Sequence, residues 1–209
     1  MITIIDYGLG NIRAFVNVYK RLKIETHIAN SVSDLENSTH IILPGVGSFD
    51  HAIKMLNSSG MRDKLDLLVL EKKIPVIGIC LGMQIMGESS KEGKSPGLGW
   101  IDGKVELFND KSIPYKTQYP HMGWNSIQPT KKSDIFSGLE NEPRFYFLHS
   151  YYFVCHNHSD TIATTQYGIE YTSVFNHENI YGIQCHPEKS HFNGVQLLKN
   201  FSQLSNDKT

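Results

Sequence analysis

Short apolar runs alternate with amphipathic segments through the first 80 residues of the chain. Runs rich in aliphatic and β-branched side chains predict buried strands at Ile2–Ile5, Thr26–Ala29, His40–Leu43 and Pro75–Ile79. Apolar positions at helical spacing predict a helix over 12–22, with Asn11 as its N-cap, and another from about Phe49 to Leu70, broken near 58–60. This alternation predicts right-handed βαβ units around a mostly parallel sheet.

After Gly103 the pattern changes to strand-like segments with little helix between them. These segments are Lys104–Phe108, Asn125–Gln128, Arg144–Leu148, Tyr151–Val154, Thr161–Gln166 and Tyr171–Phe175. They are expected to extend the sheet or to form an antiparallel flank. Tyr181–Cys185 predicts one more strand, and the apolar spacing over 192–201 predicts a closing helix. Because no repeat or linker interrupts the chain, we expect a single α/β domain over residues 1–209.

Composition and charge narrow the possible partners and the compartment. The 209 residues are 40% hydrophobic, and 20 basic and 21 acidic side chains give a net charge of -1 without a basic or acidic block. Neither nucleic acid nor a membrane surface is therefore expected as a partner. The start lacks the charged region of a signal peptide, and three cysteines, an odd number, argue against a disulfide framework. A reducing, cytoplasmic location is the expectation.

The segment Gly78-Ile79-Cys80-Leu81-Gly82 lies where the fourth predicted strand passes into a helix. A nucleophile there sits on a sharp turn at the carboxyl edge of the sheet, as in the G-x-S-x-G elbow, with sulfur in place of oxygen. The helix N-terminus favours a thiolate, and the Leu81 N–H points to where an oxyanion would form. The alternative is a small buried cysteine in a tight turn.

A second candidate group, His186-Pro187-Glu188, follows the last predicted strand. Side chains two residues apart in extended chain face the same way, so Glu188 can orient one imidazole nitrogen while the other faces a thiol. Alone, this tripeptide would more often be a surface turn. Together with the elbow at Cys80, it predicts a nucleophile–base–orienter triad.

Three other motifs offer weaker chemistry. Pro44-Gly45-Val46-Gly47 could supply a second oxyanion donor from Val46 or Gly47, or it could be an ordinary turn. The segment 6–11 resembles the start of a dinucleotide loop, but Arg13 stands where the third glycine would be, which argues against a phosphate site. The segment 155–158 contains residue types that ligate metals, but no second cluster has the spacing of a zinc site, so a polar loop and no metal are expected there. Cys185 is interpreted as core.

Six ordered motifs together resemble the class I glutamine amidotransferases, and more closely the glutaminase subunits of imidazole glycerol phosphate synthase. The resemblance runs nearly end to end and rests on Asp6–Asn11, Leu43–Gly47, Gly78–Gln84, His121–Asn125, His149–Tyr152 and His186–Ser190. It implies a flavodoxin-like open, mixed and mostly parallel sheet flanked by helices. One residue departs from the pattern, because Cys185 stands where the family commonly has Phe.

The resemblance also implies roles for individual residues. Cys80 would be the nucleophile, His186 the base and Glu188 its orienter, while Gln84 and the backbone of Ser150 and Tyr151 would hold L-glutamine. No cofactor is implied. The implied partner is a (β/α)₈-barrel cyclase subunit that receives the ammonia in a heterodimer of histidine biosynthesis. Positions that match the docking face of the family are Asn11, Trp124, Tyr146 and Lys189.

Alternatives from other classes stay open at this point. A paralogous glutaminase could supply ammonia for sugar amidation in surface-polysaccharide or flagellar glycan synthesis, because the motifs belong to the glutaminase reaction and not to the pathway. A cysteine peptidase of similar fold could use the same elbow. A scaffold subunit could retain the triad without turning over any substrate.

Overall fold

A computed structural model describes residues 1–109, 111, 113 and 119–205 of the chain. Its first half alternates strands and helices, as the apolar pattern predicts. The elements are β1 (Ile2–Ile5), α1 (Ile12–Leu22), β2 (Thr26–Ala29), β3 (His40–Gly45), α2 (Phe49–Ser58), α3 (Arg62–Asp66), β4 (Val76–Cys80) and α4 (Leu81–Ile85). The predicted helix over 49–70 is two helices followed by a π-helical turn at Leu67–Glu71, with the break near the expected position.

The second half consists mainly of strands. They are β5 (Ser89–Ser90), β6 (Gly103–Leu107), β7 (His121–Ser126), β8 (Gln128–Pro129), β9 (Arg144–His149), β10 (Tyr151–Cys155), β11 (Thr161–Tyr167), β12 (Ile169–His177) and β13 (Ile180–Ile183), and α5 (His191–Phe201) closes the fold. Short 3₁₀ turns occupy Val32–Leu35, Asp134–Phe136, His158–Asp160 and Pro187–Lys189. The predicted strand at Asn125–Gln128 is two separate strands, because β7 begins at the buried, polar His121 and pairs with β9 while β8 pairs with β11.

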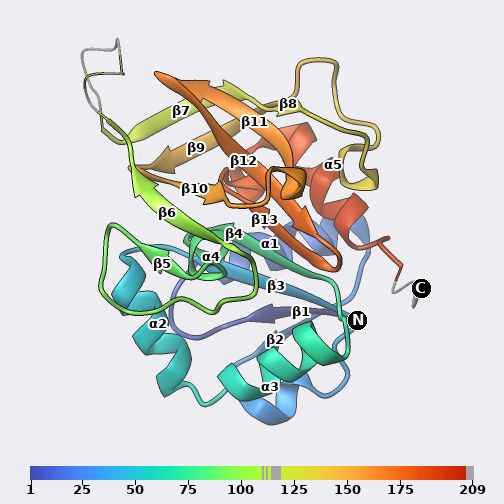
Figure 1. The fold of residues 1–209 in the computed structure, drawn as a ribbon. Coiled ribbons are helices and arrows are strands. Elements are labelled where there is room, and N and C mark those ends of the chain that lie inside the picture. Colours follow the sequence, from blue (N-terminus) through green and yellow to red (C-terminus); the bar gives the residue numbers. More distant parts are fainter. Residues whose placement is uncertain (110, 112, 114–118, 206–209) are drawn as a thin grey trace.

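An open mixed sheet of eleven strands organises the described residues (Figure 1). Five neighbouring strands in the order β2-β1-β3-β4-β13 run parallel, and β12 continues the sheet antiparallel to β13. This is the strand order of doubly wound flavodoxin-like folds, which place their sites at the carboxyl ends of the parallel strands. The predicted fold class is confirmed. Strands β7 and β9 form a second, two-stranded sheet, which the sequence did not separate from the first.

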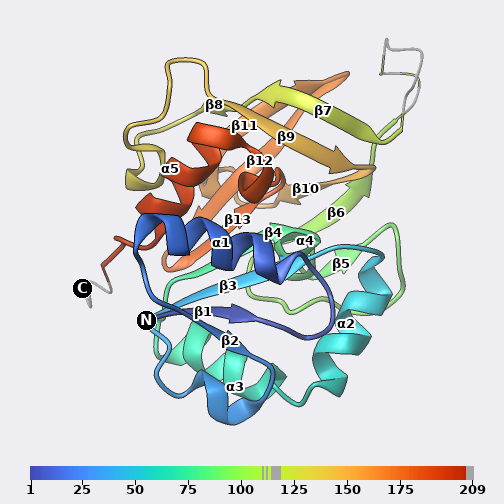
Figure 2. The same cartoon turned by 180° about the vertical axis from the view of Figure 1, so that it is seen from behind.

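Helices bury both faces of the parallel strands. Figure 2 shows α1 and α5 side by side over one face, and the Tyr19 hydroxyl on α1 donates a hydrogen bond to the Leu198 carbonyl on α5 at 2.9 Å. Helices α2 and α3 lie on the other side of the sheet (Figure 1). Consecutive residues of β3 pack into the two different cores, which explains why these strands are apolar throughout. Among the described helices, none combines the length and apolarity needed to cross a bilayer.

The packing of α4 against β3 generates a test of the fold. Gly82→Ala would place a Cβ 1.9 Å from the Leu43 carbonyl oxygen, which is main chain and cannot yield. We expect the free energy of unfolding, measured with urea, to fall by about 3 kcal/mol. Gly60→Ala is the control, because its Cβ meets no atom within 4 Å and its positive φ of 72° costs only about 1 kcal/mol. Equal losses in the two variants would contradict the close approach of α4 to β3.

Candidate active site

The predicted elbow forms at the end of β4. Cys80 is the last residue of this strand and has φ 55° and ψ −111°, a conformation that non-glycine residues rarely adopt. The flanking glycines make the turn possible: a Cβ on Gly78 would lie 2.7 Å from the main chain of Gly82, which itself crosses β3 closely. Such strain persists only where surrounding structure enforces it, and it is concentrated at functional sites.

Two amide side chains form a hydrogen-bonded chain that ends at the sulfur of Cys80. The Gln184 Nε2 donates to Cys80 Sγ at 3.8 Å, and the Gln184 Oε1 accepts from Gln84 Nε2 at 3.0 Å. Gln84 Nε2 also donates to the Tyr151 carbonyl at 3.0 Å. Sequence reasoning missed Gln184, because it stands as a lone polar residue within an apolar strand segment. Its full burial beside the sulfur is visible only in the structure.

His186 and Glu188 are in contact and almost fully buried. The His186 Nδ1 lies 2.9 Å from Glu188 Oε1, and the two side chains are 5% and 2% exposed. The expectation that extended chain brings them together is wrong, because Pro187 opens a 3₁₀ turn at Pro187–Lys189 instead. Ser190 holds this turn: its Oγ donates to the His186 carbonyl at 2.5 Å and accepts from the Tyr146 N–H at 3.0 Å.

Opposing electrostatic effects act on the His186 imidazole. Burial alone would lower its pKa, but the adjacent Cys80 sulfur and the Glu188 carboxylate favour the charged ring and raise the pKa to about 10. The ring is therefore protonated near neutral pH, between a sulfur on one side and a carboxylate on the other. A protonated imidazole next to a cysteine favours the nucleophilic thiolate.

A cavity of about 320 Å³ opens at this triad. Its lining residues are Val46, Gly47, Cys80, Leu81, Gln84, Glu92, Pro120, Leu148, His149, Ser150, Tyr151, His186 and Lys189. All the residues predicted for the oxyanion and the substrate thus face one space, together with two members of the triad. Glu92, Pro120 and Leu148 were not predicted, since they come from loops and strand ends that no local motif joins to the elbow. His149 begins one of the six motifs, but no role was predicted for it.

The glycine loop after β3 lies directly beside the elbow. Gly45 is paired with Cys80 in the parallel ladder, and a Cβ on Gly45 would lie 2.5 Å from the Gly82 nitrogen. The Tyr7 hydroxyl donates to the Pro44 carbonyl at 2.8 Å and fixes the start of the loop. Gly47 has φ 102°, a conformation that a side chain would strain. This loop can therefore present a backbone N–H close to the sulfur, as an oxyanion donor requires.

Glu92 is the acidic group of the cavity. The loop that carries it is held by Asp50, whose carboxylate accepts from the Lys94 and Ser95 N–H groups. Glu92 Oε2 accepts a hydrogen bond at 2.9 Å from the N–H of Phe49, which is the first residue of α2. Burial raises the pKa of the Glu92 carboxyl, and the Asp50 charge adds to this, while the Phe49 N–H opposes it.

Three of the four predicted docking residues lie on β7, β9 and the turn after β13, and the fourth, Asn11, lies before α1. Trp124 stacks on His191 with ring centroids 5.0 Å apart and meets Tyr146 edge to face at 6.2 Å. The Lys189 Nζ lies 5.8 Å from the centre of the Tyr146 ring. Asn11 lies exposed directly before α1, and its side chain makes no capping hydrogen bond, contrary to expectation. The exposed side chains of Met122 and Phe192, at 60% and 57%, add apolar surface.

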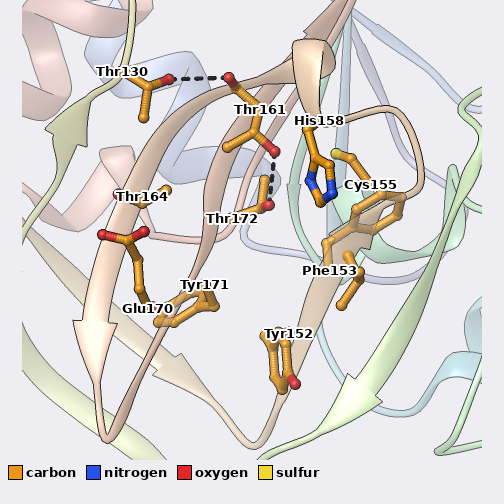
Figure 3. Close-up of a pocket in the computed structure, with 11 residues that line it drawn as sticks. Thr130, Tyr152, Phe153, Cys155, His158, Thr161, Thr164, Glu170, Tyr171 and Thr172 are labelled. Atoms are coloured by element: carbon orange, nitrogen blue, oxygen red, sulfur yellow. Dashed lines mark hydrogen bonds between the residues drawn. The ribbon is translucent and has the colours of Figure 1, made fainter.

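The other two cysteines lack the features of the elbow. Cys185 is fully buried in the core, as expected, and burial holds its pKa well above the ordinary value. Cys155 lines a second cavity, of about 380 Å³, between β10, β11 and β12 (Figure 3). Burial raises the pKa of Cys155 to about 11, so it stays a thiol. The hydroxyls of Thr161 and Thr172 pair with each other there at 2.9 Å (Figure 3).

The fold and the site are those of an α/β enzyme with a cysteine as its candidate nucleophile. A family model described as Glutamine amidotransferase class-I matches residues 3–203. The chain therefore belongs to the class I glutamine amidotransferase family, as its six motifs predicted. It is 52% identical over 204 residues to the imidazole glycerol phosphate synthase subunit HisH of Bdellovibrio bacteriovorus, covering 98% of this chain and 100% of that one.

Further comparisons agree with this assignment. The subunit of the same name from Leptospira borgpetersenii is 49% identical over 204 residues, again covering 98% of this chain and 100% of that one. A solved structure described as a glutamine amidotransferase superposes with a TM-score of 0.75 at 18% identity, covering 97% of each chain. At that identity the superposition supports the fold alone.

The buried histidines behind the cavity generate a prediction for the pH dependence of stability. Burial lowers the pKa of His121 to about 4 and that of His149 to about 3, and the neighbouring His121 also lowers the latter. Between these values and 6.5 the unfolded chain binds two protons that the folded chain does not, so stability must fall as pH falls. The raised pKa of His186 acts in the opposite direction near pH 7, but well below pH 6.5 both states bind its proton and it no longer contributes. The lowered pKa of His40 acts in the same direction as those of His121 and His149.

Urea unfolding at pH 7, 6 and 5 measures this effect. The free energy of unfolding should fall by about 1.4 kcal/mol per pH unit for each of the two histidines below pH 6.5. His158→Asn is a control, because that side chain is exposed, and it should leave the slope unchanged. A free energy of unfolding that does not change between pH 6.5 and 5 would contradict the neutral, buried state of His121 and His149.

Proposed function

We propose that this protein is a glutaminase subunit that hydrolyses L-glutamine to glutamate and ammonia through Cys80, His186 and Glu188. The observation that carries the proposal is that the strained Cys80 elbow and the buried His186–Glu188 pair meet at one cavity large enough for an amino acid. Family membership supports the same reaction.

In the proposed reaction the Cys80 thiolate attacks the carboxamide carbon of glutamine. The resulting oxyanion is held by the Leu81 N–H and by an N–H of the glycine loop, from Val46 or Gly47. The protonated His186 gives its proton to the departing ammonia, which leaves a γ-glutamyl thioester. His186 then takes a proton from water, a second tetrahedral intermediate forms, and its collapse releases glutamate and restores the thiolate. No step requires a cofactor.

The walls of the cavity account for the choice of an amino-acid substrate. Gln84 uses its Nε2 on the Tyr151 carbonyl and on Gln184, so its carbonyl end is the one available to a donor. The backbone of Ser150 and Tyr151 lies on the same wall. We assign the half-buried carboxylate of Glu92 to the α-ammonium group of the substrate, because a paired opposite charge offsets the cost of removing both from water.

The ammonia is proposed to pass to a cyclase subunit of (β/α)₈-barrel fold, in a heterodimer that makes imidazole glycerol phosphate and aminoimidazole carboxamide ribonucleotide for histidine biosynthesis. The names of the relatives, each a subunit of imidazole glycerol phosphate synthase, support this partner. The docking face would contain Asn11, Trp124, Tyr146 and Lys189. Lys189 lines the cavity as well, so the docking face borders the site of ammonia release.

Loss of the Cys80 thiol should separate glutamine hydrolysis from the synthesis carried out by the partner subunit. Cys80→Ala should abolish glutamine-dependent synthesis by the assembled complex, while synthesis from added ammonium salt should continue at the wild-type rate, because only the nucleophile is lost. Product formation with each nitrogen source measures this. Cys155→Ala is the matched control and should retain both activities, since that thiol lies outside the cavity. A Cys80→Ala variant that still hydrolyses glutamine would contradict the assignment.

Docking of the partner subunit is expected to activate glutamine hydrolysis. One oxyanion donor typically contributes about 3 kcal/mol, so a small adjustment of the 45–47 loop on docking can change the rate by about 10²-fold or more. We expect weak glutamine hydrolysis by the isolated chain and strong hydrolysis with the cyclase. Steady-state glutamate release measures both, and equal rates would exclude activation by docking.

Substitution of Glu92 tests its assignment to the α-ammonium group of glutamine. Glu92→Gln keeps the shape and the bond from the Phe49 N–H but removes the negative charge, so KM for glutamine should rise by about tenfold or more. Asp50→Asn is the comparison, because Asp50 holds the same loop without lining the cavity. An unchanged KM in Glu92→Gln would remove Glu92 from the glutamine site.

A further inference from the structure

A buried chain of imidazole and phenol groups lies behind the wall of the cavity. The His149 Nδ1 lies 2.8 Å from the Tyr151 carbonyl, and its Nε2 lies 3.2 Å from His121 Nδ1 and 3.1 Å from the Tyr171 hydroxyl. That hydroxyl also lies 3.1 Å from His121 Nδ1, and the Asn125 Nδ2 lies 3.2 Å from His121 Nε2. The two imidazoles and the Tyr171 phenol have no role in the proposed chemistry.

The proton positions in this chain follow from its two ends. The Asn125 Oδ1 accepts from the Ser126 N–H and its Nδ2 donates to the Gln166 carbonyl, so the amide orientation is fixed. The same Nδ2 therefore donates to His121 Nε2, which leaves the proton of the neutral ring on His121 Nδ1. At the other end the carbonyl of Tyr151 can only accept, so His149 carries its proton on Nδ1.

The hydrogen bonds between His121, His149 and Tyr171 agree with the proton positions deduced at the two ends of this series of side chains. His149 Nε2 is then an acceptor, and both the His121 Nδ1–H and the Tyr171 hydroxyl can donate to it. Every ring nitrogen has a partner, which removes the cost of burying two imidazoles among aromatic side chains. The result is one N–H, on His149 Nδ1, aimed at the Tyr151 carbonyl.

The Tyr151 carbonyl lies at the connection between the two sheets. Ser150 is the single residue between β9 in the small sheet and β10 in the large one. The Tyr151 carbonyl just beyond it also accepts from Gln84 Nε2, so two buried side chains donate to the same oxygen. Leu148, His149, Ser150 and Tyr151 all line the cavity, so the position of this joint sets the shape of one wall.

We propose that His149, with its tautomer set by His121 and Tyr171, is a positioning residue that fixes the Tyr151 carbonyl and thereby the glutamine-binding wall 148–151. The proposal rests on the proposed glutaminase function. A wall that contacts the substrate equally in the ground and transition states affects KM more than kcat. An aromatic ring without the N–H would fill the same volume but would leave the carbonyl held by Gln84 alone.

The experiment compares His149→Phe with His149→Asn in the complex with the cyclase. Phe keeps the planar ring and removes the donor, whereas the Asn Nδ2 can replace Nδ1 in donating to the Tyr151 carbonyl. We expect KM for glutamine to rise about tenfold in His149→Phe, with kcat changed less than about threefold, and KM to return toward the wild-type value in His149→Asn. Equal KM values in the two variants, or a wild-type KM in His149→Phe, would overturn the proposal.

Two further variants serve as a control and as a second test of the positioning role. Ser173→Ala removes a buried hydroxyl that has no hydrogen-bond partner among the described residues, and it should leave KM and kcat unchanged. If His149→Phe does not fold, His121→Phe removes the donor to His149 away from the cavity; KM should rise there too, and an unchanged KM would overturn the proposal.

Labelling of Cys80 by 6-diazo-5-oxo-L-norleucine, followed by intact mass, tests the proposed function independently. A wild-type complex that neither takes the label nor turns over glutamine refutes the glutaminase. A labelled and active wild-type complex whose His149→Phe variant has the wild-type KM refutes the positioning role alone.

Discussion

The close approach of main chain to main chain at the end of β4 is the constraint on which the site depends. Cys80 holds a positive φ because Gly82 lies against the Leu43 carbonyl and Gly45 lies against the Gly82 nitrogen. These contacts leave no room for side chains, so β3, β4 and α4 are fixed relative to one another. The same contacts place the glycine loop beside the sulfur. The proposed nucleophile and its proposed oxyanion donors are thus positioned by one set of backbone contacts, and not by separate interactions.

Buried polar side chains then connect this packed centre to the rest of the cavity. Gln184 donates to the sulfur, Gln84 joins Gln184 to the Tyr151 carbonyl, and His149 contacts the same carbonyl. Each of these groups would be costly to bury alone, and each becomes inexpensive because its neighbour is fixed. A network in which every member depends on the next has one arrangement, which is the property that a preorganised site needs.

Much of this arrangement could be predicted from the sequence, and the missing parts share a physical reason. The parallel strands, the elbow at Cys80 and the 45–47 loop depend on local patterns of apolar residues and glycines, which sequence reasoning reads directly. The His186–Glu188 contact was predicted for the wrong reason, since a 3₁₀ turn and not extended chain produces it. Gln184 and Glu92 were missed, because their roles arise from contacts between distant segments that leave no local pattern. His121 and His149 each begin one of the six motifs, but their contact was not predicted, because it joins segments far apart in the chain. The second sheet was missed for the same reason.

The turn at Pro187–Lys189 connects the proposed catalytic residues to the predicted docking face. Glu188 faces inward to His186, while the next residue, Lys189, lines the cavity and lies over the ring of Tyr146. The Tyr146 carbonyl in turn accepts a hydrogen bond from the His186 N–H at 2.8 Å, so β9 and the turn together hold the proposed general base. A partner that docks on Trp124 and Tyr146 would therefore contact the strand whose main chain holds His186, without any intervening element. Because the path from Tyr146 to His186 is hydrogen-bonded on both sides of the turn, it is one route by which docking would alter the position of the imidazole.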